Sequence, residues 1–132
     1  MQILPESKIQ QSIVNDFHNN YCREKHNPQL IIYSVPNGIP VPLTKDIRAR
    51  ALDLLHKTGM LNGASDLIIQ GVNGRILNVE VKAETKQSPA QKDFQKRVET
   101  LGGRYILVYS LTDFKNKLIP HISWLQNKQL AD

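Results

Sequence analysis

The chain has 132 residues, of which 40% are hydrophobic and 22% are charged, and these values are typical of one soluble globular domain. The sequence contains neither an apolar run of about 20 residues that would span a bilayer nor the basic and apolar start of a signal peptide. Cys22 is the sole cysteine, which excludes a disulfide framework and a cysteine zinc site and predicts a cytoplasmic protein. The net charge of +5 favours a polyanionic partner.

The first third of the chain predicts one helix and one strand. Apolar residues recur at every fourth position over residues 5–21, which predicts a helix with one buried face. The apolar run at residues 30–35 predicts a buried strand, closed by the turn sequence at residues 36–38. Two prolines predict an irregular loop at residues 39–43.

The middle of the chain predicts a helix followed by a hairpin. Thr44 is suited to cap a second helix, which Gly59 is placed to end. Residues 64–70 and 75–82 then predict two strands, joined by a tight turn of the Asn-Gly kind at residues 72–75.

The last third predicts a helix, a strand and a helical tail. Ser88, Pro89 and Gln91 have the spacing of a capping box at the start of a third helix. Two glycines at residues 102–103 end this helix, and residues 104–109 form a strand. The tail at residues 114–132 predicts a helix broken near Pro120. The whole order predicts an α/β fold with a small mixed β-sheet flanked by helices.

Charged side chains share one face of the predicted strand at residues 75–82. Side chains alternate across a strand, so Asn78, Glu80 and Lys82 lie on one face and apolar residues on the other. The hairpin would bring Asp66 close to Glu80 and Lys82. Two carboxylates at that distance repel each other unless a cation lies between them, and hard oxygen ligands suit Mg²⁺. With a lysine beside it, such a site has the parts needed for phosphodiester hydrolysis.

The same residues allow a second interpretation. Glu80 and Lys82 would then form a solvated pair on an exposed sheet face, where such pairs contribute little to stability. Asp, a gap of 13 residues and Glu-x-Lys is also a spacing that arises by chance. Spacing alone leaves both interpretations open.

Several short motifs follow one another from residue 6 to about residue 113. They are Glu6-Ser-Lys-Ile-Gln10, Pro36-Asn37-Gly38, Arg50-Ala51…Leu55-x-Lys57, Gly59-Met60-x-x-Gly63-x-Ser65-Asp66-Leu67, Val79-Glu80-Val81-Lys82, Ser88-Pro89-Ala90-Gln91-Lys92-x-Phe94 and Gly102-Gly103. In this order they resemble the virus-type replication-repair nuclease (VRR-NUC) domain, a branch of the PD-(D/E)XK nucleases. The resemblance implies a single domain over residues 1–132 with a restriction-endonuclease-like core.

The resemblance also implies a metal site for Mg²⁺ or Mn²⁺. Its ligands would be Glu6, Asp66, Glu80 and the Val81 carbonyl, with Lys82 as the motif lysine. Without the resemblance, Glu6 would be interpreted as a first-turn acid favoured by the helix dipole.

Gln91 has two interpretations, which are compatible with each other. It completes the capping box, and by resemblance it also points at the metal site as a catalytic residue.

DNA contacts are implied for polar and basic residues around the site: Gln10, Asn37, Arg50, Lys57, Ser65, Lys86 and Lys92. Further basic residues are interpreted mostly as solvated: Lys45, Arg48, Lys96 and Arg97. Two features depart from the family pattern, because Ser65 stands where the superfamily has proline and the loop after Gly38 lacks basic residues.

The resulting hypothesis is a metal-dependent DNA endonuclease that acts as a homodimer on Holliday junctions or flaps in phage or bacterial replication, recombination or repair. The apolar tail around Ile119, Ile122 and Trp124 would supply dimer contacts or pack into the core. An exonuclease with the same site stays open. So does a DNA-binding module without catalysis, although the complete set of acids and lysine argues against it. The four histidines lack ligand spacing, so zinc is not expected.

Overall fold

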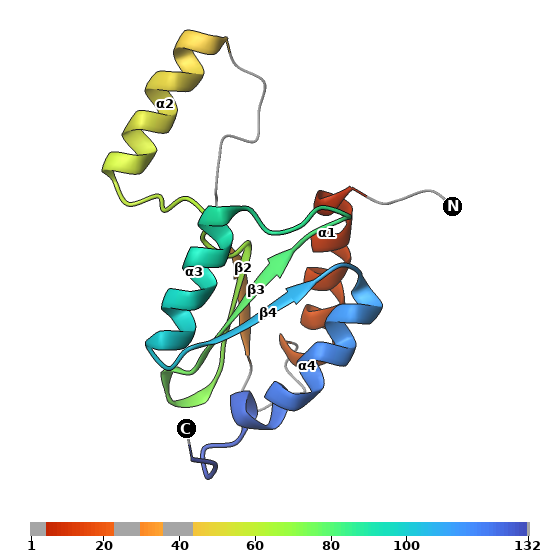
Figure 1. Cartoon of the computed structure of the whole chain (residues 1–132). Coiled ribbons are helices and arrows are strands. Elements are labelled where there is room, and N and C mark those ends of the chain that lie inside the picture. Colours follow the sequence, from red (N-terminus) through yellow and green to blue (C-terminus); the bar gives the residue numbers. More distant parts are fainter. Residues whose placement is uncertain (1–4, 23–29, 36–43, 132) are drawn as a thin grey trace.

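The computed structural model describes residues 5–22, 30–35 and 44–131 (Figure 1). Along these residues the order is helix, strand, helix, two strands, helix, strand and helix, which confirms the predicted order. The predicted turn at residues 36–38 and loop at residues 39–43 lie outside the described residues. No described helix combines the length and the apolar character that a membrane span requires.

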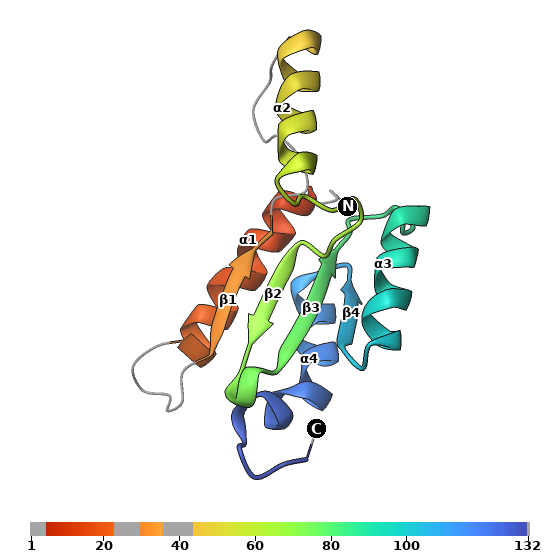
Figure 2. The ribbon, with the colours of Figure 1, turned by 90° about the vertical axis from the view of Figure 1, so that its left-hand side faces the viewer.

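The described strands form one mixed sheet in the order β1-β2-β3-β4 (Figure 2). Their bounds are β1 (Ile31–Ser34), β2 (Leu67–Gln70), β3 (Ile76–Val81) and β4 (Arg104–Val108). The pairs β1–β2 and β2–β3 are antiparallel, and β3–β4 is parallel. The β2–β3 turn is the predicted one, because Asn73 and Gly74 have φ of 58° and 72°, the positive values that such hairpin turns require. In this strand order β3 lies between β2 and β4, inside the sheet.

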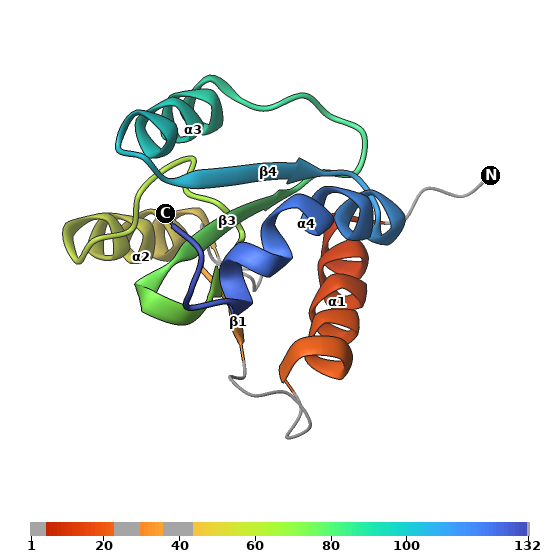
Figure 3. The same ribbon diagram turned by 90° about the horizontal axis from the view of Figure 1, so that it is seen from below.

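Helices cover the two faces of the sheet unequally. Helices α1 (Glu6–Phe17) and α4 (Leu111–Gln126) lie on one face, and α3 (Pro89–Thr100) lies on the other (Figure 3). The core between the sheet and the α1–α4 layer is formed by buried apolar side chains, which include Ile9, Ile13, Phe17, Leu67, Ile69, Leu77, Val79, Val81, Phe114, Leu118 and Leu125. The predicted periodicity of the first helix is confirmed, and the helix continues into a π-helical turn at His18–Cys22.

The predicted strand at residues 30–35 is present, but the structure buries only one of its faces. Strand β1 lies at the edge of the sheet, and its Ile31 and Tyr33 side chains are 54% and 46% exposed. Within the strand, Ile32 alone is buried, on the face that joins the core. An apolar run cannot by itself distinguish a strand covered on both faces from an edge strand covered on one.

The predicted break of the last helix at Pro120 is wrong. Helix α4 begins at Leu111 and runs through Pro120 to Gln126 without interruption. Proline removes the hydrogen bond to the carbonyl four residues earlier, which belongs to Asn116. Both residues are exposed, so water can satisfy that carbonyl. Because α4 contributes buried side chains to the core, the tail is an integral layer of the fold.

Helix α2 (Lys45–Lys57), like α3, contains no buried residue. It projects from the end of the sheet at which α1 and α3 begin (Figures 1 and 2). Its predicted limits are confirmed, with Thr44 at the N-cap position and Gly59 at φ 116° after the helix, although the Thr44 side chain makes no capping hydrogen bond.

A candidate metal and phosphate site at the end of strand β3

Asp66 directly precedes the first residue of β2 and lies beside Val81, the last residue of β3. The β2–β3 ladder ends at the Leu67–Val79 pair, and Asp66, Glu80 and Val81 lie just beyond it. The Asp66 Oδ2 atom accepts a hydrogen bond of 2.7 Å from the Val81 N–H. Because the N–H and C=O of one strand residue point to the same side, the Val81 carbonyl is also directed toward Asp66.

Glu80 is the most unusual residue of the sheet, since its side chain is charged in water but only 1% exposed here. Its Oε1 accepts a hydrogen bond of 3.1 Å from Gln91 Nε2, whereas its buried Oε2 has no partner among the described residues. Burial raises the pKa of Glu80 to about 9. The Asp66 charge, a side-chain hydrogen bond that the two acids share when one of them is protonated, and the Glu6 charge add to the rise, while Lys82 opposes it. This burial contradicts the interpretation of a solvated Glu80–Lys82 pair.

These donors fit a hard divalent cation. An unpartnered buried carboxylate oxygen, a neighbouring carboxylate and a backbone carbonyl are the oxygen ligands that Mg²⁺ takes, with waters completing its shell. In the described part of the chain, no three His, Cys, Asp or Glu side chains come close enough to hold a metal together. Glu6, which is exposed in the first turn of α1, therefore forms no such cluster with Asp66 and Glu80, although its charge acts on Glu80.

Gln91 makes the capping contact predicted from its spacing, and it also contacts Glu80. The Gln91 side-chain Oε1 accepts a hydrogen bond from the Ser88 backbone N–H at 2.8 Å, and the Gln91 backbone N–H donates to Ser88 Oγ at 3.2 Å. The capping box is therefore confirmed. The other end of the same amide donates to Glu80. The helix cap thus fixes the orientation of an amide that holds a buried carboxylate.

Lys82 follows β3 directly and is partly buried. Its N–H donates to the Val108 carbonyl at 2.9 Å, which anchors the backbone to β4. The side chain forms no salt bridge with any described residue, and its charge lowers the pKa of Glu80. Its ammonium group is therefore free to contact an anionic ligand near the two carboxylates.

The prediction that Ser65 contacts DNA is wrong. Ser65 is 1% exposed, and its hydroxyl donates to Asn78 Oδ1 at 3.0 Å. Asn78 Nδ2 in turn donates to the Arg104 carbonyl at 3.1 Å. This chain of hydrogen bonds joins the residue before Asp66 to β3 and β4, so it holds the Asp66 loop in place.

Sequence reasoning assigned no role to the polar network next to Glu80 under α3. Gln87 Nε2 donates to Gln95 Oε1 at 2.9 Å and to the Tyr105 hydroxyl at 3.1 Å. Burial raises the pKa of Tyr105, and the Glu80 charge adds to this, so its phenol stays neutral. A tyrosine inside an apolar strand gives too weak a signal to identify such a network from sequence.

The basic residues named for DNA contact lie on the surface. Arg50, Lys86 and Lys92 are exposed, and Lys57 is exposed with a salt bridge of 2.8 Å to Asp53. The further basic residues Lys45, Arg48, Lys96 and Arg97 are exposed too. Asn37 lies outside the described residues.

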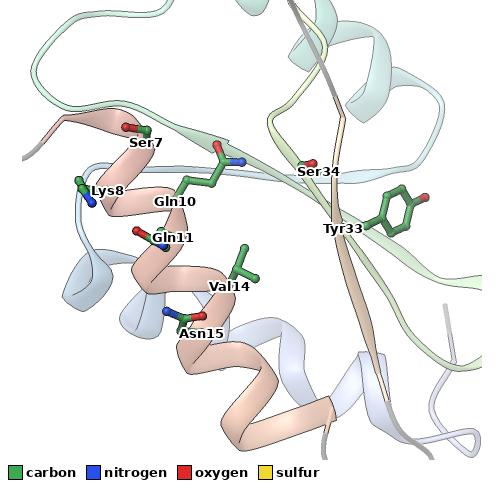
Figure 4. A pocket seen from close by; sticks show the side chains of 8 residues that line it. All are labelled: Ser7, Lys8, Gln10, Gln11, Val14, Asn15, Tyr33 and Ser34. Atoms are coloured by element: carbon green, nitrogen blue, oxygen red, sulfur yellow. The ribbon is translucent and has the colours of Figure 1, made fainter. Parts of the chain in front are cut away.

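A groove with a volume of about 580 Å³ separates α1 from β1 (Figure 4). Its lining is mostly uncharged and polar: Ser7, Lys8, Gln10, Gln11, Val14, Asn15, Tyr33 and Ser34. The Gln10 side chain points from α1 toward Ser34. The groove adjoins the site, because Val35 N–H, next to Ser34, donates to the Asp66 carbonyl at 2.9 Å.

Comparisons with known proteins find this fold in solved structures. No protein-family model matches the sequence, and no curated protein matches it. A solved structure named "VRR_NUC domain protein" superposes with a TM-score of 0.69 at 19% identity, over 96% of this chain and 93% of that chain. Another, named "VRR_NUC domain", has a TM-score of 0.53 at 23% identity, over 88% of this chain and 95% of that chain. The predicted fold class is confirmed, and the chain has the fold of the VRR_NUC domain.

Proposed function

We propose that the chain is a DNA nuclease that depends on a divalent metal ion and acts through Asp66, Glu80 and Lys82. The observation that carries this proposal is the buried Glu80 carboxylate beside Asp66 at the end of β3, whose Oε2 accepts no hydrogen bond from the described part of the chain. A protein that keeps such a group inside its sheet has a functional reason for doing so, because an unsatisfied buried acid costs stability. The names of the solved structures with this fold support nuclease chemistry.

Mg²⁺ or Mn²⁺ would be held by Asp66, Glu80 and the Val81 carbonyl, with Glu6 adding negative charge from α1. When bound, the ion would lower the pKa of a water molecule and stabilise negative charge on the phosphate oxygens.

The residues of the chain orient the site and neutralise charge. The Val81 N–H fixes one Asp66 oxygen, and the Gln91 amide fixes Glu80 Oε1, so the remaining oxygen of each carboxylate is left for a ligand. The Lys82 ammonium group neutralises negative charge that develops on the phosphate in the transition state.

DNA is the proposed substrate, and its backbone would be bound by exposed basic residues. Helix α2, with Arg50 and Lys57, projects from the end of the sheet that carries the site (Figure 1). Such contacts bind phosphates without reading sequence and weaken as salt rises. The mostly uncharged groove with Gln10 would accept an unpaired part of the substrate, which fits branched DNA such as junctions or flaps.

A homodimer is part of the proposal. Ile47 and Leu54 of α2 are 54% and 62% exposed, and Ile119 of α4 is 69% exposed, so a second copy could cover apolar surface on both helices. Ile122 and Trp124 pack against the core instead, so they serve the fold rather than the dimer. We propose that residues 1–132 act as one domain in the cytoplasm, in phage or bacterial DNA replication, recombination or repair.

The proposal is tested by incubating the protein with four-way junction, flap, linear duplex and closed circular DNA, with and without Mg²⁺ or Mn²⁺. Metal-dependent cleavage of branched DNA is expected, and cleavage of circles would identify an endonuclease. Glu80→Ala should abolish it, and Lys82→Ala should lower its rate by about 10²–10³-fold. Cleavage at the wild-type rate in both variants contradicts the site. Binding of DNA by the wild-type protein without any cleavage supports the DNA-binding module.

A further inference from the structure

Gly63 lies against the backbone of α3 at a distance that no other residue type allows. A Cβ atom at this position would lie 2.3 Å from the Ala90 carbonyl oxygen, 2.4 Å from its carbon and 2.8 Å from the Gln91 nitrogen. All three atoms belong to the backbone, so no flexible side chain could move aside. Its φ of +83° also favours glycine.

The contacted atoms belong to the first turn of α3, where the Gln91 amide is held between the helix cap and Glu80. Gln91 gives its amide oxygen to Ser88 and its amide N–H to Glu80, and it lies partly buried. A displacement of this turn would therefore move the amide relative to the carboxylate. Gly63 is three residues before Asp66, so its contact fixes the spacing between the loop that carries one carboxylate and the helix that holds the other.

We propose that Gly63 is a positioning residue of the nuclease site, which acts by keeping the first turn of α3 close enough for Gln91 to hold Glu80. The effect on catalysis rests on the function proposed above, whereas the effect on the Gln91 amide does not.

The chain supplies a matched control in Gly74. Gly74 has φ +72° in the β2–β3 turn, and a Cβ there would meet nothing within 4 Å. Gly74→Ala therefore introduces similar backbone strain without the collision, and it separates a loss of conformational freedom from a displaced helix.

The experiment follows the side-chain amide of Gln91 by ¹H–¹⁵N NMR in the metal-free protein, with Gln91→Ala used to assign the signal. Gly63→Ala is expected to shift this signal, whereas Gly74→Ala leaves it in place. In the cleavage assay Gly63→Ala should lose about 10²-fold in rate, the size of effect that a misplacement of about 1 Å can cause. An unshifted amide in a folded Gly63→Ala protein would overturn the proposal, whether or not the wild-type protein cleaves DNA.

A double variant tests whether Gly63 acts through Gln91. If it does, Gly63→Ala should reduce the cleavage rate little further in a Gln91→Ala background, whereas independent effects would multiply and contradict this route.

Ser88→Ala provides a second test should Gly63→Ala not fold. This substitution removes the hydroxyl that accepts the hydrogen bond of the Gln91 backbone N–H, but it keeps the contact of Gly63 with Ala90. The proposal expects the Gln91 amide to stay on Glu80 in this variant. A shift of the NMR signal of the Gln91 side-chain amide in Ser88→Ala would show that the cap alone positions Gln91, and it would reject the role of Gly63.

Discussion

The two faces of strand β3 are both buried, but they are buried for different reasons. Leu77, Val79 and Val81 point into the core formed with α1 and α4, where burial itself is favourable. On the other face, Asn78 is satisfied by two hydrogen bonds, whereas Glu80 keeps one oxygen without a partner among the described residues.

The difference separates the apolar residues and Asn78, which stabilise the fold, from Glu80, whose burial destabilises it. Asn78 lies on the polar face and yet links Ser65 to the Arg104 carbonyl, so polarity alone does not mark function. A buried acid without a hydrogen-bond partner does mark function, because the free-energy cost of burying it is expected to be offset by binding of a ligand.

The largest effect on stability is expected from the apolar face. Leu77→Ala should lower the free energy of unfolding by about 2–5 kcal/mol, since Leu77 is fully buried and its removal leaves a cavity. Ile76→Ala is the matched control on the adjacent residue, which is 41% exposed, and it should cost less. Denaturant unfolding of both variants checks this, and equal losses would contradict the assignment of faces.

Substitution of Lys82 is expected to lower the rate of catalysis and to leave the free energy of unfolding almost unchanged. Lys82→Ala should lower the cleavage rate by about 10²–10³-fold, the range found when one charge-stabilising group is removed. Lys128→Ala removes an equal charge from an exposed position near the C-terminus and should leave the rate unchanged. If both variants lose the same activity, the effect is one of net charge and Lys82 has no special role.

A further effect, seen as a slope with pH, links Glu80 to the stability of the metal-free protein. Its pKa is raised from 4.5 to about 9 on folding, so between these values the folded state binds more protons than the unfolded state. Stability should therefore fall as pH rises from 4.5 to 9, by at most about 1.4 kcal/mol per pH unit from this group. Glu80→Gln should flatten this slope when unfolding is measured in the presence of a chelator. A slope unchanged by the substitution would show that Glu80 ionises normally.

The smallest effect is expected for the satisfied part of the polar face. Ser65→Ala should cost about 1 kcal/mol of unfolding free energy, because it removes one hydrogen bond to Asn78. Ser34→Ala, at an exposed position, is the control for stability. DNA affinity measured with Ser65→Ala should not change, and a marked loss of affinity would restore the predicted DNA contact.

Local signals in the sequence predicted much of the fold. The Asn73-Gly74 turn and the Ser88–Gln91 capping box are confirmed because each is decided by neighbouring residues. Alternation along β3 also placed Glu80 and Lys82 together on one face, and the hairpin placed Asp66 beside them.

Features that depend on tertiary surroundings could not be predicted in this way. The apolar pattern of α2 indicated a helix, but it could not show that Ile47 and Leu54 would be exposed. The burial of Ser65 depends on Asn78, which is 13 residues away, and the contact of Gly63 with Ala90 joins a loop to the first turn of α3. Pro120 was expected to break α4 because the cost to the backbone is local, whereas the packing that holds the helix together is not.

The most direct test of the metal site is a titration of the protein with Mn²⁺ by calorimetry at constant pH, compared with Glu80→Gln. The wild-type protein is expected to bind the ion, and Glu80→Gln should lose this binding while remaining folded. Equal affinity in both proteins, or no binding by the wild-type protein, would contradict the assignment of Asp66 and Glu80 as metal ligands.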